Sequence, residues 1–537
     1  MGHMGSGLDS ESLEMVLGTL RAVAERRLPQ PMRLELDGKQ RFPEEVVREL
    51  LGPEVGLHLV FIPEDAGGLG GGAYDLFRVS EEMARIDLGV ATAFLAIALG
   101  IDPIIVAGTP EQRRHWLGRV AEEGLIVAYA VTEPAVGSNV AGIRTTATPI
   151  PGPDGSPRAY RLDGTKQFIT NGGVAHLYTV LARTPQGPSF FVVERDTPGL
   201  EPGPDEHKHG IRASNTTQVV LDGVEVPADR LLGLTEGEGL HQAGRVFGFT
   251  RLMVAAFGLG AGEEALDRVI RYAMEREQFG SPLYAKQGYT HTLIVPHFVR
   301  LEAARAFCEQ TARRLDEGGE DLHVEGSVAK LFATEAGNAA ADAAMQGHGG
   351  YGYTVEYEVE KIRRDVRITT IYEGTSEIQK SIIGTFRWRQ QVRTGGGFYT
   401  GLAAAVRGAG GEEAAALAAE ALGATYLLAH RKRLLRRQWI LFELARLSAE
   451  VETAVALALK AAAAPGDPLL GLCARLHAGG AARETATAGA RLLRASGELQ
   501  REEMEAWKDE TRHADLLATA QGELEVLDEA AERIAAR

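Results

Sequence analysis

The sequence predicts an α+β protein of several domains: an N-terminal helical domain, a central antiparallel β-barrel-like domain, a C-terminal four-helix bundle and an extra helical domain. Three patterns support this prediction. Apolar residues recur at helical spacing up to about residue 127, short alternating runs between turn residues fill 129–233, and long amphipathic stretches return after 239. The predicted domains are residues 1–127, 128–238, 239–395 and 396–537.

The composition is that of an ordinary globular protein with enough chain for a large core. The 537 residues are 45% hydrophobic and 24% charged. A net charge of −16 argues against nucleic acid as the main partner, because no overall positive field attracts phosphates. Cys308 and Cys473 lie in apolar helical patterns and are predicted to be buried thiols. No cluster has metal-ligand spacing, so we predict no metal site.

The first residues of the chain are relevant to the cellular location of the protein. Residues 1–7, MGHMGSG, resemble an expression-vector remnant, and no signal peptide follows them. We therefore expect a cytoplasmic protein, with membrane association as the alternative. The most membrane-like stretch, residues 90–108, contains Asp102 and Pro103, which favour a buried pair of helices.

In the first domain, helical spacing is found in residues 13–26, 43–51, 74–86 and 91–101. Between them, residues 61–72 form a glycine-rich run with a GxGxxA pattern at Gly68, Gly70 and Ala73. A dinucleotide site needs a strand before such a run. The context here is helical, so we interpret the run as a loop.

The remaining elements follow the same logic. Alternating runs predict strands near residues 160–164, 177–181, 190–193 and 218–223. Amphipathic spacing predicts long helices over 252–278, 287–316 and 324–346, as in an antiparallel bundle. Residues 394–397, TGGG, mark a flexible boundary. The alanine- and leucine-rich chain after it is helical, with a break at 464–468, APGDP.

Residues 371–379, IYEGTSEIQ, organise the functional prediction. Gly374 permits a tight turn, and Thr375 or Ser376 can cap a following helix. Glu373 is therefore predicted to project from a helix-to-helix turn beside the Tyr372 ring. A carboxylate shielded from water is a stronger base, because desolvation disfavours its charged form. The alternative is a helix-capping turn whose glutamate points into solvent.

Four further motifs accompany this turn: residues 129–139, YAVTEPAVGSN; 165–172, TKQFITNG; 276–282, REQFGSP, with Gln287 soon after; and 346–352, QGHGGYG. In this order and spacing, the five motifs resemble the acyl-CoA dehydrogenase family of flavoproteins. The resemblance covers roughly residues 40–390. The C-terminal extension, including residues 437–442, RQWILF, is similar to that of the very-long-chain branch.

The resemblance implies FAD as the cofactor. The implied FAD contacts are Tyr129, Val131, Thr132, Gly137, Ser138, Phe168, Ile169, Thr170, Arg276, Gln278, Phe279, Gln287, Gln346, Gly347, Gly350, Thr375 and Glu377. The residue types are suitable, because a flavin needs an apolar wall for its ring and donors for its polar edge. Phe168 offers the wall, and Thr132 and Thr170 offer hydroxyls. The alternatives are a core aromatic at Phe168 and an ordinary turn at Gly137–Ser138.

In the family, the Arg276 and Gln346 motifs contact the FAD of a neighbouring subunit, which implies a homodimer, with a tetramer as the alternative. An arginine suits a pyrophosphate because its planar fork donates two charge-assisted hydrogen bonds. The alternatives are a surface arginine at a helix C-terminus and a helix-ending glycine run at 346–350.

The resemblance also assigns the chemistry. Glu373 matches the base that removes the α-proton of an acyl thioester, with Ser138, Arg251, Tyr372 and Gly374 near the substrate. Some family members place the base one residue before the arginine. That position is Thr250 here, and a threonine cannot be the base. The alternative for Arg251 is a surface salt bridge.

Two departures from the family pattern affect substrate recognition. A common acidic position is Gly248 here, and the usual Gly-Ser-Asp reads Gly-Ser-Asn at Asn139. A carrier-protein thioester is therefore an alternative to acyl-CoA. The uncharged residues 91–99 align with the floor of the acyl pocket and favour medium to long chains, although a buried core helix has the same pattern.

The expected electron acceptor is an electron-transfer flavoprotein. One alternative is an acyl-CoA oxidase that uses O₂, and another is a flavin-containing assembly or scaffold protein. Within 426–447, the basic run 431–439, RKRLLRRQW, is compatible with a peripheral contact with an anionic membrane, although a solvated helix face is slightly favoured.

Overall fold

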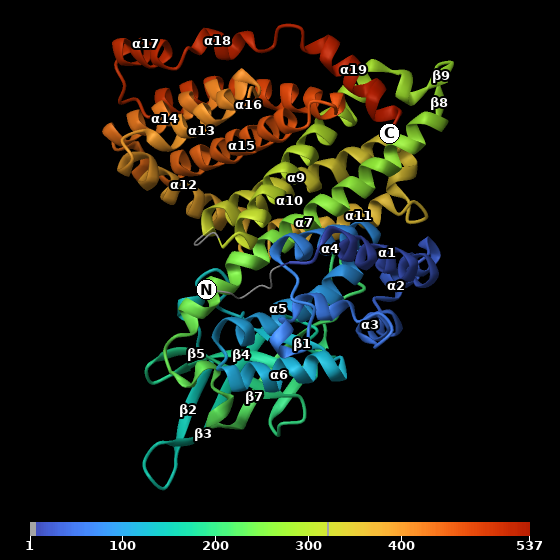
Figure 1. Ribbon diagram of the computed structural model, residues 1–537, viewed down its shortest axis with the longest axis vertical. Helices are drawn as coiled ribbons and strands as arrows, with labels where there is room; N and C mark the ends of the chain where they lie inside the picture. The colour runs from blue at the N-terminus through green and yellow to red at the C-terminus, as the bar shows by residue number, and fades with distance from the viewer. Residues whose placement is uncertain (1–6, 319–321) are drawn as a thin grey trace. The chain divides into compact units, whose positions relative to one another are not determined.

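The computed structural model describes residues 7–318 and 322–537 (Figure 1). Residues 1–6 of the predicted vector remnant lie outside this part. The chain forms two compact units. Unit 1 comprises Met1–Gly260, Ala312–Glu320 and Arg364–Ile368, and unit 2 comprises Ala261–Thr311, Asp321–Arg363 and Thr369–Arg537.

Unit 1 begins with the predicted helical domain. Its helices are α1 (Ser10–Arg27), α2 (Gln30–Lys39), α3 (Glu44–Leu51), α4 (Ala73–Ile86), α5 (Leu88–Ala107) and α6 (Pro110–Glu123), with the 3-10 turns η1 (Leu57–Phe61) and η2 (Glu64–Ala66). The four predicted helical segments are confirmed as α1, α3, α4 and α5. Helices α2 and α6 were not singled out by the sequence pattern, because charged residues dominate both.

The glycine-rich run is a loop, as predicted. It contains the 3-10 turn η2, begins at the end of η1 and leads directly into α4, so no strand precedes it in the described chain. A Cβ at Gly68 would lie 1.9 Å from the carbonyl oxygen of Ile62, and one at Gly71 would lie 2.6 Å from that of Val60. These glycines allow two backbone segments to pack closely, which explains the pattern without a nucleotide.

Helix α5 is one continuous helix with Pro103 inside it, so the predicted helix pair is wrong. It is the single helix of the described chain that is long and apolar enough to span a bilayer, and 83% of its apolar window is buried in the protein. It packs on β1 and β4 (Figure 1). A Cβ at Gly100 would lie 2.6 Å from the Val127 carbonyl oxygen. This close packing is typical of a core helix.

The central domain is a seven-stranded sheet with the order β1-β4-β2-β3-β7-β6, in which β5 pairs with β4. The strands are β1 (Val127–Ala130), β2 (Thr146–Pro151), β3 (Pro157–Thr170), β4 (Leu177–Thr184), β5 (Gly187–Glu194), β6 (Leu200–Asp205) and β7 (Thr216–Pro227). Strand β4 runs parallel to β1 and β2, and the other pairs are antiparallel. The prediction of a purely antiparallel domain is therefore wrong. The chain reverses twice between β2 and β4, once in the β2–β3 hairpin and once between β3 and β4, so β4 runs in the same direction as β1 and β2.

The helices after the sheet are α7 (Gly239–Glu275), α8 (Gln287–Leu293), α9 (Val295–Asp316), α10 (His323–Gly347), α11 (Val359–Val366) and α12 (Ser376–Arg393), with a small hairpin of β8 (Glu277–Gln278) and β9 (Ser281–Pro282). The helix predicted over 287–316 is divided at Ile294 into α8 and α9. Pro296 explains the division, because it lacks an N–H and suits the first turn of a new helix.

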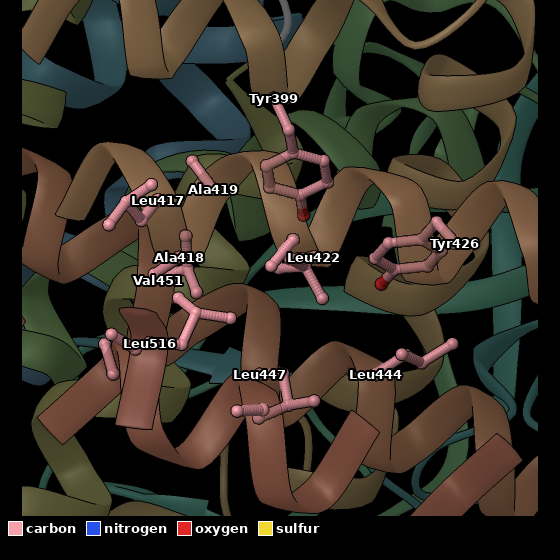
Figure 2. Close-up of a cluster of buried hydrophobic side chains, with 14 of the residues drawn as sticks. Tyr399, Leu417, Ala418, Ala419, Leu422, Tyr426, Leu444, Leu447, Val451 and Leu516 are labelled. Carbon is pink, nitrogen blue, oxygen red and sulfur yellow. The ribbon is translucent and has the colours of Figure 1, made fainter. Parts of the chain in front are cut away.

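The extension contains α13 (Gly397–Gly408), α14 (Glu413–Arg431), α15 (Gln438–Ala463), α16 (Pro468–Ala495), α17 (Arg501–Glu510), α18 (His513–Ala518) and α19 (Glu523–Ala535). The predicted break at 464–468 is confirmed. Asp467 caps α16 by accepting the Leu470 N–H at 3.0 Å. Figure 2 shows the core of this region, where Leu422, Leu447 and Leu516 meet fully buried.

Contacts in α15 and α19 join the extension to earlier parts of unit 2. In α15, Glu450 and Lys460 pair with Arg300 and Glu309 at 2.8 and 2.7 Å. Arg387 of α12 donates to both carboxylate oxygens of Glu452 at 2.8 and 2.7 Å, and both side chains are almost completely buried. Near the end of the extension, α19 packs on α8. The Tyr284 hydroxyl donates to the Ala531 carbonyl at 2.8 Å, although 247 positions separate the two residues. The predicted boundary at 395/396 stays a prediction.

Candidate active site

The predicted site residues divide between the two units. Unit 1 carries Tyr129, Val131, Thr132, Gly137, Ser138, Phe168, Ile169, Thr170 and Arg251. Unit 2 carries Arg276, Gln278, Phe279, Gln287, Gln346, Gly347, Gly350, Tyr372, Glu373, Gly374, Thr375 and Glu377. Each group is described within its own unit.

In unit 1, the segment after β1 lies against β3. The Thr132 carbonyl accepts the N–H of Gln167 at 2.9 Å, immediately before Phe168. Two motifs about 35 residues apart in the sequence are therefore adjacent in the fold. The structure thus brings together Val131, Thr132 and Phe168, as the sequence motifs predict.

A buried ion pair fixes this junction. Lys166 of β3 donates to Glu133 Oε1 at 2.9 Å and to the Val131 carbonyl at 3.1 Å. Glu133 also accepts the N–H groups of Arg144 and Thr145 at 2.7 and 2.9 Å. Lys166 has no exposed side-chain surface, and Glu133 has 4%.

These contacts perturb the titration of both groups. Burial lowers the pKa of Lys166 from 10.5 to about 8, against the opposing effect of Glu133. Burial raises the pKa of Glu133, but hydrogen bonds from Thr145 and Lys166 outweigh it and hold that pKa below 4.5. The carboxylate therefore stays ionised at neutral pH. The sequence motifs assigned no role to either residue. The signal that could have found them is a lysine and a glutamate inside otherwise apolar, strand-forming motifs.

Phe168 is suitably placed to act as a wall for a ligand. Its backbone has φ of +58°, and its side chain is 63% exposed, whereas the next residue, Ile169, is buried. The alternative of a core aromatic is therefore wrong. An exposed ring on a buried platform, with the half-buried Thr132 and Thr170 nearby in the chain, fits the apolar and hydrogen-bonding requirements of a flavin.

The other predicted residues of unit 1 are placed as follows. Gly137 and Ser138 lie in an exposed bend, where a Cβ at Gly137 would touch nothing within 4 Å. The Tyr129 ring stacks on Phe190, with a centroid distance of 5.8 Å. Arg251 of α7 is 5% exposed, so its alternative as a surface salt-bridge residue is wrong.

In unit 2, the Arg276 motif forms the hairpin of β8 and β9. Phe279 and Gly280 occupy its tip with φ of +52° and +78°, the conformation of a two-residue hairpin loop. Phe279 is 96% exposed. The Arg276 guanidinium lies 6.0 Å from the centre of the Tyr351 ring. The hairpin therefore presents an aromatic and a cation to the outside of unit 2.

Two other motifs make contacts that need no cofactor. A Cβ at Gly347 would lie 2.4 Å from Val269 Cγ2, so this glycine is required for helix packing, whereas Gln346 and Gly350 are exposed. Gln287 donates to Asp528 of α19 at 2.9 Å. The assignments of these residues to FAD stay predictions.

The Glu373 turn has the geometry predicted from its sequence. It links the 3-10 turn η8 (Arg367–Thr370) to α12, and Thr375 caps α12 by accepting the Ile378 N–H at 3.4 Å. Glu373 is half-buried, with φ of +52°, a left-handed conformation that only a few per cent of non-glycine residues adopt. The intermediate exposure of Glu373 leaves both interpretations of this turn as predictions, and the predicted helix cap is present.

The carbonyl groups of this turn are held by two side chains that have no exposed surface. Lys330 of α10 donates to the Gly374 carbonyl at 2.8 Å. Gln379 of α12 donates to the Glu373 and Gly374 carbonyls at 3.1 and 2.9 Å. Neither side chain was found from the sequence motifs. Glu377, in the first turn of α12, has a lowered pKa, chiefly because its carboxylate accepts its own backbone N–H.

The basic stretch within 426–447 is not a continuous amphipathic helix. It spans the end of α14, a turn and the start of α15. Leu434 and Leu435 are buried, and Lys432 and Arg437 pair with Glu503 and Glu498 at 2.6 and 2.7 Å. The leucines therefore belong to the protein core and are not available to a lipid surface. The described residues contain no group of His, Cys, Asp and Glu suited to a metal ion.

Family models match three consecutive segments of the chain. The N-terminal, middle and C-terminal domains of acyl-CoA dehydrogenase match residues 10–124, 128–224 and 237–386. A relative from Bacillus subtilis (strain 168), named acyl-CoA dehydrogenase, is 37% identical over 357 residues, which are 65% of this chain and 91% of the relative.

Solved structures agree with these matches. An acyl-CoA dehydrogenase from Bacillus anthracis complexed with FAD covers 98% of this chain and 95% of its own at 24% identity, with a TM-score of 0.85, and shows the shared fold of nearly the whole chain. Butyryl-CoA dehydrogenase from Megasphaera elsdenii is 34% identical over 70% of this chain and 97% of its own, with a TM-score of 0.65.

A third structure, the prolyl acyl carrier protein oxidase AnaB, is 28% identical over 71% of this chain and 98% of its own, with a TM-score of 0.65. The sequence identities, the shares of the chains that are covered and the five motifs all indicate the same family. The chain belongs to the acyl-CoA dehydrogenase family of FAD-dependent oxidoreductases.

Proposed function

We propose that this protein catalyses the FAD-dependent α,β-dehydrogenation of acyl-CoA thioesters to trans-2-enoyl-CoA, with Glu373 as the base. The observation that carries this proposal is the constrained, half-buried Glu373 in a turn whose carbonyls are bound by buried donors. A general base must keep its position while it accepts a proton, and a fixed backbone provides that. Family membership supplies the reaction class.

Bound FAD supplies a hydride acceptor for the β-hydrogen of the substrate. Thr132, Phe168 and Thr170 would hold its ring, and Arg276 of a neighbouring subunit would hold its pyrophosphate. Glu373 takes the α-proton, and the C–H electron pair becomes the second bond between Cα and Cβ. The Glu373 backbone N–H would hydrogen-bond to the thioester oxygen, on which negative charge develops. Ser138, Arg251, Tyr372 and Gly374 would line the substrate.

The substrate class and partners extend this proposal. The uncharged α5 segment favours medium to long acyl chains, and the extension supports a relation to the very-long-chain branch. A second copy of this chain would complete each FAD site, because the exposed Arg276 and Phe279 hairpin needs a neighbour. An electron-transfer flavoprotein would reoxidise the cofactor, and a cytoplasmic location is proposed. The arginines of the α14–α15 turn leave an electrostatic membrane contact as a subsidiary proposal.

The test of the base is Glu373→Gln, which keeps the size of the side chain and removes its basicity. We expect the purified variant to retain FAD and to lose flavin bleaching when an acyl-CoA is added. Glu510→Gln, a change of an exposed carboxylate in α17, is the matched control and should bleach normally. Normal bleaching by Glu373→Gln would refute the assignment of the base.

The test of the shared cofactor site is Arg276→Ala. Loss of the guanidinium should increase FAD loss on dialysis, measured by the ratio of flavin to protein absorbance, while the secondary structure is unchanged. Arg271→Ala changes another exposed arginine on the same helix end and serves as the control. Equal FAD retention by both variants would contradict the proposed pyrophosphate contact.

An oxidase is the second candidate, favoured by the similarity to the prolyl acyl carrier protein oxidase. Both enzymes would use the same base and cofactor, and they differ in the electron acceptor. Stopped-flow measurement of flavin reoxidation in air separates them. Turnover in air without a dye acceptor would support the oxidase, and dependence on an electron-transfer flavoprotein would support the dehydrogenase.

A further inference from the structure

The backbone conformation at Glu373 needs support from outside the turn. Glu373 and Gly374 both have positive φ, +52° and +91°. Glycine adopts this region freely, whereas a residue with a Cβ does so at a cost in free energy. A turn that places a catalytic carboxylate at such a residue persists only if surrounding groups stabilise it.

That support comes from two buried side chains, Gln379 and Lys330, which donate hydrogen bonds to the carbonyl groups of the turn. Gln379 Nε2 bonds to the carbonyls of residues 373 and 374, and Lys330 Nζ bonds to the second one. In a planar peptide unit the C=O and N–H point in opposite directions. Fixing these two carbonyls therefore fixes the peptide planes on either side of Gly374, the first of which is attached to the Cα of Glu373. The bonds thus restrict, from its C-terminal side, the direction in which the Glu373 side chain leaves the backbone.

One donor to the Gly374 carbonyl is a fully buried lysine, and this residue type at this position needs an explanation. Burying an ammonium group is costly unless its protons are bound by oxygen atoms. A hydrogen bond from a charged donor is about twice as strong as a neutral one. A buried lysine bound to the Gly374 carbonyl therefore gives a rigid contact one residue after Glu373, the non-glycine residue of the turn with positive φ. A role in packing α10 against α12 does not require it, because Ser376 already donates to Glu335 between the same helices at 2.6 Å.

We propose that Lys330, together with Gln379, is a positioning residue that holds the Glu373 carboxylate in its reactive direction. This inference rests on the proposed function of Glu373 as the base. Lys330 makes no contact with substrate in this role, and it acts through the backbone of the turn. Its loss should lower the rate of proton removal and leave acyl-CoA affinity nearly unchanged.

The experiment compares Lys330→Met with Ser376→Ala in the full-length protein loaded with FAD. Methionine has a similar length and cannot donate a hydrogen bond. Ser376→Ala removes a hydrogen bond between α10 and α12 and leaves the turn carbonyls bound. Single-turnover flavin reduction by octanoyl-CoA gives the limiting rate and the apparent dissociation constant separately. We expect at least a tenfold fall in limiting rate for Lys330→Met, with less than a twofold change in the constant, and no change in either for Ser376→Ala.

Unchanged flavin reduction in Lys330→Met would overturn the proposal. An equal loss of rate in both variants would also overturn it, because a general packing defect would then explain the effect. If Lys330→Met does not fold, Gln379→Met tests the same carbonyls from α12, and the same criteria apply. The Glu373→Gln variant distinguishes a failure of the proposed function from a failure of the positioning role. Normal bleaching in Glu373→Gln would refute the proposed function. Bleaching that is lost in Glu373→Gln and proceeds at the wild-type rate in Lys330→Met would refute the positioning role alone.

Discussion

Lys166 provides the sharpest test of the electrostatics in unit 1. Lys166→Met removes the cation and leaves Glu133 ionised in a site where 4% of its side chain is exposed. Removing one partner of a buried ion pair costs about 3–5 kcal/mol, because the remaining charge has lost its counter-ion. Two backbone N–H groups still bind Glu133, so we expect the lower end, about 3 kcal/mol at pH 7.

The pH dependence of this difference follows from the lowered pKa. The pKa of Lys166 is about 8 in the folded protein and 10.5 in its ordinary state. Between these values the unfolded chain binds more protons at this site, so the free energy of unfolding rises with pH. This contribution is absent below pH 8 and amounts to about 3 kcal/mol once pH exceeds 10.5, at 1.36 kcal/mol per pKa unit. Lys166→Met lacks it, so the stability gap between wild type and variant should widen above pH 8.

Urea unfolding followed by circular dichroism at pH 7.0, 8.5 and 9.5 measures the gap directly. Lys39→Met, which removes an exposed lysine paired with Glu35, is the control and should change stability by less than about 1 kcal/mol. A gap that stays constant from pH 7.0 to 9.5 would refute the argument that burial lowers the pKa of Lys166. A variant as stable as wild type would show that the ion pair contributes nothing.

Two further predictions concern unit 2. Arg387→Met should destabilise the protein by about 3–5 kcal/mol in urea unfolding, because it removes the counter-ion of the buried Glu452. Combining it with Glu452→Met should recover part of that loss, and the loss of the Arg387–Glu325 pair at 3.2 Å should remain. A double variant no better than the single one would count against this account. Gly347→Ala places a methyl group 2.4 Å from Val269 Cγ2 and 2.6 Å from the Tyr289 hydroxyl oxygen. The overpacking should lower the free energy of unfolding by about 1–3 kcal/mol. A thermal midpoint equal to that of wild type would contradict this prediction.

The parts of the molecule that could be predicted from sequence depend on neighbouring residues. The Glu373 turn is an example, because Gly374 and Thr375 determine a turn and a helix cap locally, and the structure shows both. The longer strands β3, β4, β5 and β7 were likewise visible from alternation. Strands β1, β2 and β6 were not among the runs singled out from the sequence: β1 has only four residues, and β2 and β6 contain prolines, which are poor strand formers.

The remaining features depend on residues that are distant in the sequence. Lys166 and Lys330 look like solvent-facing lysines until the fold places Glu133 and the Gly374 carbonyl beside them. The parallel pairing of β1 with β4 depends on the two chain reversals that lie between β2 and β4. A glycine required for packing and one required for cofactor binding have the same sequence signal, which is why the role of Gly347 could not be read in advance.

The contact of α19 with α8 has a consequence for how the extension unfolds. The extension is attached to earlier parts of unit 2 through the ion pairs of α15 with Arg300, Glu309 and Arg387, and through the contact of α19 with Tyr284. Exposing the interior of α14–α16 therefore requires several of these attachments to break together. Amide hydrogens of α14–α16 should therefore exchange with solvent at the pace of α9 and α10, as parts of one cooperative block.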